Sequence, residues 1–277
     1  MQQKVSVPAL QQMKRDGRKI VGVVAWDYQV AQIVDRAGVD IVSVGDTVGV
    51  NLWGHANPLE ITMEEMIIVC RAVRRGVKRA VLSCDFPFGP LQEGTDSAVR
   101  AAIRLVKEAG VDVVKLDGAP DFLDAVEAID RAGIPVFAQF GITPQTALRY
   151  GVEYSPTPSP NSYVPSEMKD ELIEEAKRLE AAGASFLNFT NSGPVVGPAV
   201  AAAVSIPVLG GFGGGPWLDG RIRMATAAIG YSAKAIDDPP DTYANVARIT
   251  LDAISAYAED VRAGRQIRGG IPVPPRS

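Results

Sequence analysis

Cysteine, histidine and aromatic residues are scarce in this chain. Its 277 residues include two cysteines and one histidine, and aromatic side chains make up 6%. Cys70 and Cys84 both lie in apolar segments, which argues against a disulfide framework and against a zinc site. This cysteine usage is typical of the reducing cytoplasm.

Long apolar runs and a strong net charge are also absent. No run reaches the roughly 18 apolar residues that a membrane helix needs, and the segment through Lys19 lacks the apolar core of a signal peptide. A net charge of -4 offers little attraction to nucleic acid or to an anionic membrane. We therefore expect a cytoplasmic protein that acts on a small molecule and has no nucleic-acid or membrane partner.

Apolar residues are nevertheless abundant enough for a sizeable core. Hydrophobic residues make up 47% of the chain, charged residues 22%, and the mean hydropathy is +0.07, as in a globular domain. One unit recurs along the chain: an amphipathic stretch, a glycine stop and a short apolar run. The stops lie at residues 36–38, 75–76, 108–110, 131–133 and 181–183. Glycine is the usual left-handed cap of a helix, so the pattern predicts alternating helices and strands.

Eight short apolar segments are predicted to be strands. They span residues 21–25, 39–45, 80–84, 111–116, 134–139, 184–189, 206–211 and 221–225. Each is followed by helix-compatible sequence, and eight such alternations fit a (β/α)₈ barrel, which typically takes about 250 residues. We predict one α/β domain over residues 1–277, a (β/α)₈ TIM barrel, with a doubly wound open sheet as the alternative.

Three of these apolar runs lead directly into an aspartate, at Asp46, Asp85 and Asp117. Parallel strands of a barrel deliver their last residues to one rim, so neighbouring strands would bring these carboxylates together. Carboxylates gathered there repel one another unless a hard cation lies between them, so the pattern predicts Mg²⁺ and an enzyme. Lys115 precedes Asp117 by two residues and therefore points to the same side of its strand, where its ammonium can steady negative charge on a substrate.

Two connections stand out by their composition. Residues 150–166 carry four prolines, which block helices and sheet ladders, so a long loop is expected on the same rim as the aspartates. It is either a lid or substrate contact, or a surface insertion or subunit contact. Residues 210–216 contain five glycines, whose N–H groups can approach an anion closely, although a tight barrel rim explains them equally well.

Ordered motifs along the chain carry a family resemblance. Residues 44–49 read VGDTVG and residues 58–66 read PLEITMEEM, which resembles the VGDS-x-G and LPVTMDDM of ketopantoate hydroxymethyltransferases. Further matches follow in the same register, with AWDY at 25–28, DFPF at 85–88, KLDG at 115–118, GITPQ at 141–145 and GFGGGP-x-x-DG at 211–220. Residues 257–264 are similar to the family's C-terminal helix, which we expect at about 240–264. The resemblance spans nearly the whole chain.

This resemblance implies a barrel of the phosphoenolpyruvate mutase/isocitrate lyase superfamily that binds a 2-oxo acid through Mg²⁺ and stabilises its enolate. The family's metal-binding aspartates match Asp46 and Asp85, and its third acidic residue matches Asp117, whose shorter side chain would reach the ion through water. Thr47 replaces the family's serine and is expected to hold the substrate carboxylate. The resemblance also implies 5,10-methylenetetrahydrofolate as co-substrate and assembly into a homo-oligomer.

Two positions depart from the family pattern. The family carries a histidine on its fifth strand and a general-base glutamate at the end of its sixth. Here residues 138–141 read AQFG, and Thr190 or Asn191 stands where the glutamate belongs. An amide or hydroxyl cannot act as a carboxylate base near neutral pH, so another group supplies the base or the reaction needs none. The other candidate bases are His55, Glu153, Tyr154 and Tyr163.

The leading interpretation is a Mg²⁺-dependent aldolase, similar to ketopantoate hydroxymethyltransferase, that forms a carbon–carbon bond at C3 of a 2-oxo acid. A carbon–carbon lyase or decarboxylase is the alternative, because decarboxylation removes no proton from carbon. A non-catalytic barrel is a third interpretation, which the retained carboxylates argue against. The expected catalytic residues are Lys115, Asp117, Thr190 and Asn191. The expected substrate contacts are Thr47, Lys115, Gln139 and Gly211, and the expected metal ligands are Asp46, Asp85 and Asp117.

Overall fold

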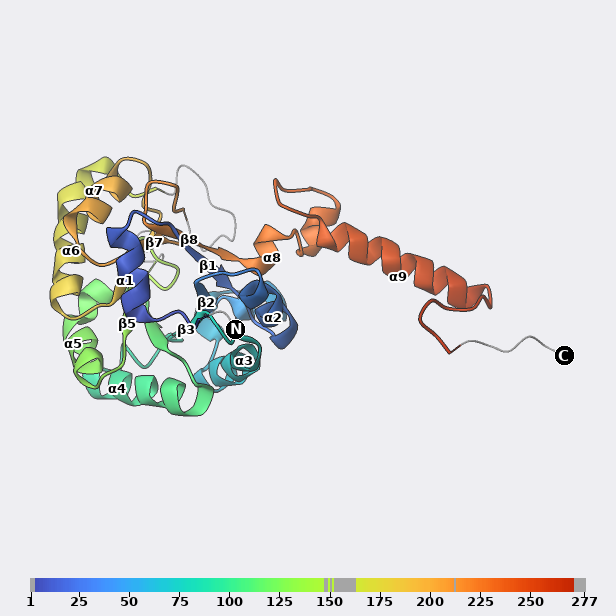
Figure 1. Ribbon diagram of the computed structural model, residues 1–277, viewed down its shortest axis with the longest axis horizontal. Coiled ribbons are helices and arrows are strands. Elements are labelled where there is room, and N and C mark those ends of the chain that lie inside the picture. Colours follow the sequence, from blue (N-terminus) through green and yellow to red (C-terminus); the bar gives the residue numbers. More distant parts are fainter. Residues whose placement is uncertain (1–2, 147–148, 150, 152–162, 212, 272–277) are drawn as a thin grey trace. The chain divides into compact units, whose positions relative to one another are not determined.

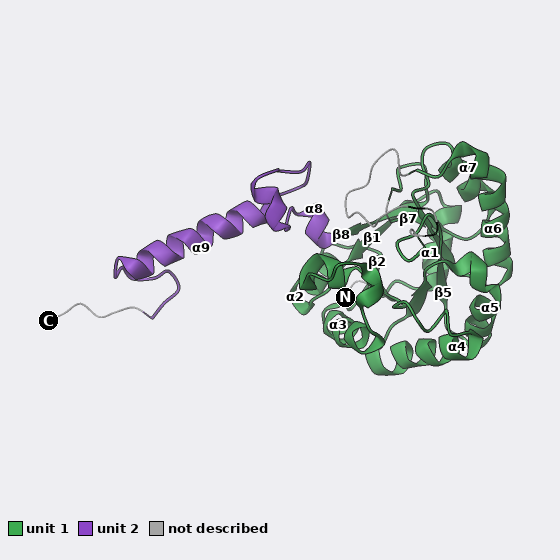
Figure 2. Cartoon of the chain, turned by 180° about the vertical axis from the view of Figure 1, so that it is seen from behind, with its two compact units in different colours: residues 1–224 green, residues 225–277 purple. Residues whose placement is uncertain are grey.

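The structure is a computed structural model that describes residues 3–146, 149, 151, 163–211 and 213–271 (Figure 1). The chain divides into two compact units, residues 1–224 and residues 225–277 (Figure 2). This division describes how the chain packs, and the expectation of one domain over residues 1–277 stays a prediction. The Pro-rich loop expected at 150–166 falls largely outside the described residues.

Eight parallel strands of the first unit close into a barrel in sequence order. They are β1 Ile20–Val24, β2 Ile41–Val44, β3 Val81–Asp85, β4 Val113–Leu116, β5 Val136–Gly141, β6 Phe186–Thr190, β7 Val208–Gly210 and β8 Gly220–Met224. The first and last strands pair from Ile20 opposite Gly220 to Val24 opposite Met224. This closure confirms the (β/α)₈ barrel and excludes the open, doubly wound sheet.

Helices alternate with these strands and surround the barrel (Figure 1). In the first unit they are α1 Val7–Arg15, α2 Tyr28–Arg36, η1 Gly49–Trp53, η2 Pro58–Glu60, α3 Met63–Gly76, α4 Thr95–Arg104, η3 Leu105–Ala109, η4 Ala119–Phe122, α5 Leu123–Arg131, η7 Ser166–Met168, α6 Lys169–Ala181 and α7 Val196–Ala203. Helix α3 begins with a capping box between Thr62 and Glu65. Gly110 ends η3 in the left-handed conformation, with φ of 70°, as the glycine stops predict.

The described part of the second unit is helical, with α8 Ala225–Ala228, η8 Ala233–Ile236 and α9 Val246–Arg262. Helix α9 begins where the Asn245 side chain accepts a hydrogen bond from the Arg248 N–H at 3.0 Å. It lies within the range expected for the C-terminal helix. Among the described residues, no helix has both the length and the apolar character that crossing a bilayer requires.

The barrel interior is apolar at one end and polar towards the other. At the N-terminal end of the strands, inward-facing residues such as Ile41 and Phe137 pack with Leu10 of α1 in the core. Side chains alternate between the two faces of a strand, so the next inward positions lie two residues further on. Those positions are polar and buried, and they include Ser43, Ser83, Lys115, Gln139 and Asn188. Apolar side chains therefore fill the N-terminal end of the barrel, and polar side chains lie towards the rim where the strands end.

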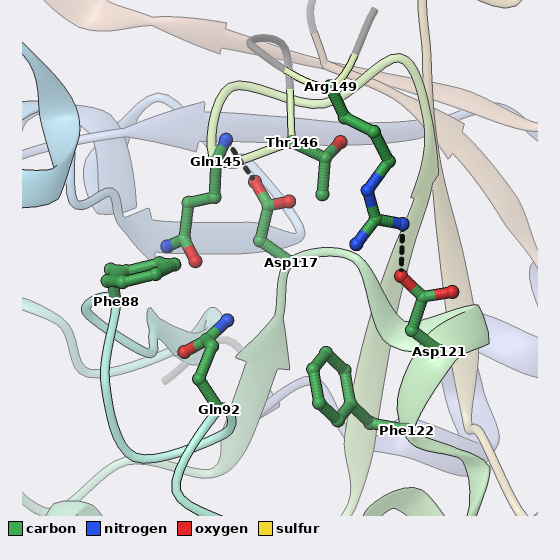
Figure 3. A pocket seen from close by; sticks show the side chains of 8 residues that line it. All are labelled: Phe88, Gln92, Asp117, Asp121, Phe122, Gln145, Thr146 and Arg149. Atoms are coloured by element: carbon green, nitrogen blue, oxygen red, sulfur yellow. Dashed lines mark hydrogen bonds and ion pairs between the residues drawn. The ribbon is translucent and has the colours of Figure 1, made fainter.

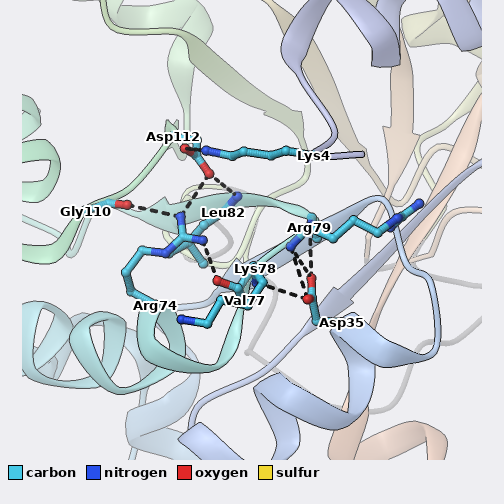
Figure 4. A network of polar contacts seen from close by, with 10 residues as sticks. Lys4, Asp35, Arg74, Val77, Lys78, Arg79, Leu82, Gly110 and Asp112 are labelled. Carbon is cyan, nitrogen blue, oxygen red and sulfur yellow. Dashed lines mark hydrogen bonds and ion pairs between the residues drawn. The ribbon is translucent and has the colours of Figure 1, made fainter. Parts of the chain in front are cut away.

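Two aspartates hold connections together on the N-terminal face of the barrel (Figure 4). Both Asp35 oxygens accept hydrogen bonds from the backbone N–H groups of residues 78–80, at 2.8 to 3.1 Å. Asp112 accepts from the Leu82 N–H at 2.9 Å and pairs with Lys4 and Arg74 at 3.0 and 3.1 Å. These carboxylates fix the segments that enter β3 and β4.

Candidate functional site

The three strand-end aspartates lie together at the C-terminal rim of the barrel. Asp85 is the last residue of β3, Asp46 follows β2, and Asp117 follows β4. Strands β2, β3 and β4 are neighbours in the barrel, so their ends are adjacent. All three residues are buried, with 4% to 7% of the residue surface exposed, and each is within electrostatic reach of the others. We call these three residues and Lys115 the carboxylate cluster.

Burial and mutual repulsion perturb the titration of this cluster. The pKa of Asp46 rises from 3.8 to about 7, mainly through burial and then through the nearby Asp85 carboxylate. Burial likewise raises the pKa of Asp117 to about 6. Burial alone would lower the pKa of Lys115, but the Asp85 and Asp46 carboxylates outweigh this effect and raise it. One ammonium therefore faces three carboxyl groups whose negative charge it does not balance.

Lys115 reaches the cluster from β4, on the same side of the strand as Asp117. Its Nζ donates to Oδ2 of Asp85 at 2.9 Å, and both side chains are 10% exposed. The other oxygen of Asp85, Oδ1, is buried and has no hydrogen-bond partner among the described residues. Leaving a buried polar atom unpaired costs about 1 to 3 kcal/mol. A cation or a ligand donor at Oδ1 would remove this cost.

The donor set at this rim suits Mg²⁺. This ion prefers oxygen ligands and is commonly bound by one or two carboxylates, with water and substrate oxygens completing its shell. The unpartnered Oδ1 of Asp85 and the raised pKa of Asp46 both indicate negative charge that the protein leaves uncompensated. In the part of the chain that the structure describes, no group of three or more His, Cys, Asp or Glu side chains is positioned to share a metal ion. Oxygen donors of this kind are compatible with the ion, and Asp46, Asp85 and Asp117 as its ligands stay predictions.

Two residues that the sequence reasoning did not single out hold these aspartates in place. Gln145 Nε2 donates to Asp46 Oδ2 at 2.8 Å and to the Phe86 carbonyl at 3.0 Å. The Thr143 hydroxyl donates to Asp117 Oδ1, and the Gln145 backbone N–H lies 3.4 Å from Asp117 Oδ2. Both residues belong to the GITPQ motif, so a signal was present in the sequence. The motif alone does not tell which side chains they contact.

Thr47 lies at the edge of the carboxylate cluster. A side chain at Gly45 would approach the Thr47 Oγ1 to 3.3 Å and Asp85 Oδ2 to 3.8 Å, so these two oxygens flank the same small space. Thr47 is half-buried, and within the described residues its hydroxyl makes no hydrogen bond. The hydroxyl is therefore available to a ligand bound beside Asp85.

Neutral side chains line the β5 and β6 side of the interior. Gln139 Nε2 donates to the Thr190 Oγ1 at 3.0 Å, and both residues are buried. Asn188 Oδ1 accepts from the Gly211 N–H at 3.0 Å, so this N–H is bound within the protein. Asn191 has φ of 55° and its buried Oδ1 has no partner among the described residues. Amides and a hydroxyl thus occupy the positions where the family carries a histidine and a general-base glutamate.

The other candidate bases are not part of the described cluster. His55 lies on the loop after β2, where its ring packs edge-on against Trp53 at 6.0 Å. Tyr163 packs edge-on against Trp217 at 6.3 Å. No contact given by the described residues joins either side chain to the three aspartates. Glu153 and Tyr154 lie outside the described residues.

A cavity of about 230 Å³ adjoins the cluster (Figure 3). Asp117 of the cluster forms part of the cavity wall, and so does Gln145, which donates to Asp46. The remaining wall includes Phe88 and Phe122, which come from the connections after β3 and β4. The rim of the barrel therefore offers a charged cluster and, beside it, a pocket with aromatic walls.

Over nearly its whole length the chain is similar to proteins of one family. A model of the family described as Ketopantoate hydroxymethyltransferase matches residues 4–266. A 3-methyl-2-oxobutanoate hydroxymethyltransferase of Cyanothece sp. is 38% identical over 261 residues, which cover 93% of this chain and 96% of that protein.

Two solved structures share the fold. A phosphonopyruvate hydrolase in complex with oxalate and Mg²⁺ matches with a TM-score of 0.57 and 15% identity over 94% of this chain and 88% of its own. A 2,3-dimethylmalate lyase, a member of the PEP mutase/isocitrate lyase superfamily, matches with a TM-score of 0.58 and 14% identity over 94% of this chain and 99% of its own. At these identities the likeness concerns the barrel architecture alone.

Proposed function

The chain belongs to the ketopantoate hydroxymethyltransferase family, and from this premise we propose that it transfers a hydroxymethyl group to C3 of 3-methyl-2-oxobutanoate through an enolate. The proposed one-carbon donor is 5,10-methylenetetrahydrofolate. The chain is thus an enzyme of carbon–carbon bond chemistry, and the non-catalytic barrel is not supported. The observation that carries the proposal is the buried carboxylate cluster at the strand ends, with the unpartnered Oδ1 of Asp85.

Asp46 and Asp85 are the proposed ligands of Mg²⁺. Their oxygens are buried, hard donors, and their charge is not balanced by the single ammonium of Lys115. When bound, Mg²⁺ supplies Lewis acidity that draws electron density away from the 2-oxo group. Gln145 keeps Asp46 oriented through its hydrogen bond to Oδ2. Asp117 either contacts the ion through water or remains available for proton transfer.

The protein's own groups account for the remaining steps of the proposal. The Lys115 ammonium is positioned beside Asp85 to stabilise negative charge that develops on the carbonyl oxygen of the substrate. Thr47 offers a hydroxyl for the substrate carboxylate on the same side. Asp117 is the carboxylate of the cluster left to accept the C3 proton, and a pKa of about 6 keeps it mostly ionised at neutral pH.

One observation favours a second candidate function. The β5 and β6 side of the site pairs Gln139 with Thr190 and contains no carboxylate at these positions. Cleavage or decarboxylation of a 2-oxo acid removes no proton from carbon, so a neutral wall there does not hinder it. A Mg²⁺-dependent carbon–carbon lyase or decarboxylase is therefore the alternative.

A product assay separates these two functions. The full-length protein is incubated with Mg²⁺, 3-methyl-2-oxobutanoate and 5,10-methylenetetrahydrofolate, and the products are identified by mass spectrometry. A 2-oxo acid enlarged by one hydroxymethyl group is the expected product, and chelation of Mg²⁺ should abolish it. Release of CO₂ or an aldehyde from 2-oxo acids, without condensation, would instead establish the alternative.

A further inference from the structure

The pocket beside the carboxylate cluster is built from the connections that follow three consecutive strands (Figure 3). Phe88 and Gln92 follow β3, Asp121 and Phe122 follow β4, and Gln145 follows β5. Connections at the C-terminal ends of barrel strands are the usual place for substrate binding in this architecture. Apart from Asp117 and Gln145, the residues that line this space have no role in the proposed metal site or in the proposed binding of the 2-oxo acid.

Two aromatic rings give the pocket its shape. Phe88 and Phe122 belong to different connections and flank Gln92 in Figure 3. Phe88 is 44% exposed, so its ring is accessible to a ligand. Phe122, the last residue of η4, is half-buried. Aromatic rings that line a pocket offer flat faces on which a planar heterocycle can stack.

The polar groups of the pocket favour a neutral heterocycle over an anion. Asp121 forms an ion pair with Arg149, which offsets the charge of the guanidinium at the rim. Asp117 adds a further acidic group to the wall. Phosphate sites in proteins gather unbalanced cations at helix N-termini. Phe122 is the N-cap of α5, but Asp121 and Asp124 beside it supply negative charge at this helix end. Gln92 has its Oε1 occupied by the Gly89 N–H at 2.8 Å, so its Nε2 is the end directed to other acceptors.

The pocket and the carboxylate cluster share a wall. Gln145 lines the pocket, and its Nε2 donates to Asp46 on the cluster side. Asp117 also belongs to both. A ligand in the pocket therefore has one end next to the place where the 2-oxo acid would bind, as a reaction between two substrates requires.

We propose that this pocket binds the pteridine ring of the one-carbon donor, stacked between Phe88 and Phe122, with its reactive edge towards Gln145. This assignment rests on the proposed function. The volume of about 230 Å³ is below the roughly 300 to 1,000 Å³ that enclose a drug-sized ligand, so the pocket accommodates a bicyclic ring and not the whole donor. The remainder of the donor would extend past the Asp121–Arg149 pair to the surface, where both side chains are exposed.

Binding of tetrahydrofolate to matched variants tests the assignment. Affinity is measured by fluorescence titration of the full-length protein with Mg²⁺ and 3-methyl-2-oxobutanoate present. Phe122→Leu and Phe88→Leu remove one ring each and are expected to weaken binding roughly tenfold. Phe122→Tyr keeps the ring and is expected to bind within about threefold of wild type. Ile103→Ala, at a 41% exposed position of α4 outside the pocket, is the control for surface truncation.

The outcomes separate this assignment from the proposed function. Loss of affinity in both Leu variants, with the Tyr variant and Ile103→Ala unaffected, supports the pocket, provided that melting temperatures match wild type. If wild type forms the hydroxymethylated product but the Leu variants bind tetrahydrofolate as tightly as wild type, the pocket assignment is wrong and the function stands. If wild type binds no tetrahydrofolate and forms no such product, the proposed function itself fails.

Discussion

The two ends of the barrel both gather aspartates, and they treat them in opposite ways. At the N-terminal face, burial alone would raise the pKa of Asp112, but the Leu82 N–H, Lys4 and Arg74 outweigh it and hold that pKa below its usual value (Figure 4). Asp35 is satisfied by three backbone N–H groups. These carboxylates have all the partners they need from the protein.

At the C-terminal rim, in contrast, the aspartates lack some of the partners that a buried carboxylate needs. The pKa values of Asp46 and Asp117 are raised, mainly by burial, and Asp85 keeps a buried oxygen without a partner in the described residues. Aspartates at the N-terminal face therefore stabilise the fold, whereas we expect a bound ligand to supply the missing partners of those at the other rim. Substitutions at the N-terminal face should therefore lower stability, and substitutions at the C-terminal rim should lower activity.

The largest effect is expected from removing a proposed metal ligand. Asp85→Asn and Asp46→Asn should each lower Mg²⁺-dependent turnover by about 10³-fold or more, because the charge that attracts the ion is lost. Both variants should still fold, since asparagine keeps the shape of the side chain, and turnover is compared per folded molecule. Asp96→Asn, at an exposed position of α4, is the matched control. Full activity in either ligand variant would contradict the assignment.

The next largest effect belongs to the N-terminal face. Asp35→Ala leaves the backbone N–H groups of residues 78–80 without their acceptor, and the free energy of unfolding should fall by about 3 kcal/mol. Turnover per folded molecule should remain that of wild type. Denaturant unfolding and the kinetic constants measure the two quantities. A large loss of kcat at unchanged stability would break the proposed division between the two ends.

Mg²⁺ should stabilise the native protein through the rim and not through the opposite face. At a Mg²⁺ concentration of about 100 times Kd, the expected gain is about 2.7 kcal/mol, seen as a rise in melting temperature that chelator reverses. In Asp85→Asn, Mg²⁺ should no longer raise the melting temperature. In Asp112→Asn, Mg²⁺ should raise it as in wild type, although the melting temperature without Mg²⁺ should be lower than in wild type. An equal rise in wild type and Asp85→Asn would place the ion elsewhere.

The last prediction concerns the pH dependence of stability. The pKa of Asp46 is about 7 in the folded metal-free protein, against 3.8 for an unperturbed aspartate, which stands for the unfolded state. The folded state therefore binds the proton more tightly. Between these values stability falls as pH rises, by at most about 1.4 kcal/mol for each pH unit. Asp112 acts in the opposite sense, since its lowered pKa gives stability that is lost as pH falls. Melting curves of metal-free wild type and Asp46→Asn from about pH 4 to pH 7 should therefore diverge, and parallel curves would contradict this assignment.

Much of the fold was predictable because the relevant signals are local. A buried parallel strand is a short apolar run, so segments such as residues 111–116 located β4 to within two residues. The strand at 221–225 carries two arginines and was the weakest signal, yet β8 occupies 220–224 and closes the barrel. The aspartates at the strand ends followed from the same pattern, because the architecture sends them to one rim.

The unpredicted features depend on contacts between distant segments. Gln145 and Asp46 are far apart in sequence, and no periodicity indicates that one orients the other. The carboxylate of Asp112 has hydrogen-bond partners and Oδ1 of Asp85 has none among the described residues, and this difference likewise depends on which groups the fold brings near. A cytoplasmic location and a homo-oligomeric assembly depend on surfaces beyond a single chain, and they stay predictions.

Proton exchange at C3 of 3-methyl-2-oxobutanoate in D₂O tests the central claim most directly, because it needs the rim carboxylates and Mg²⁺ but no one-carbon donor. Deuterium incorporation should depend on Mg²⁺, disappear on chelation and be lost in Asp85→Asn. Exchange that proceeds equally without Mg²⁺ or in Asp85→Asn, or no exchange at all by a wild-type protein that binds the substrate, would contradict the claim that this rim forms an enolate.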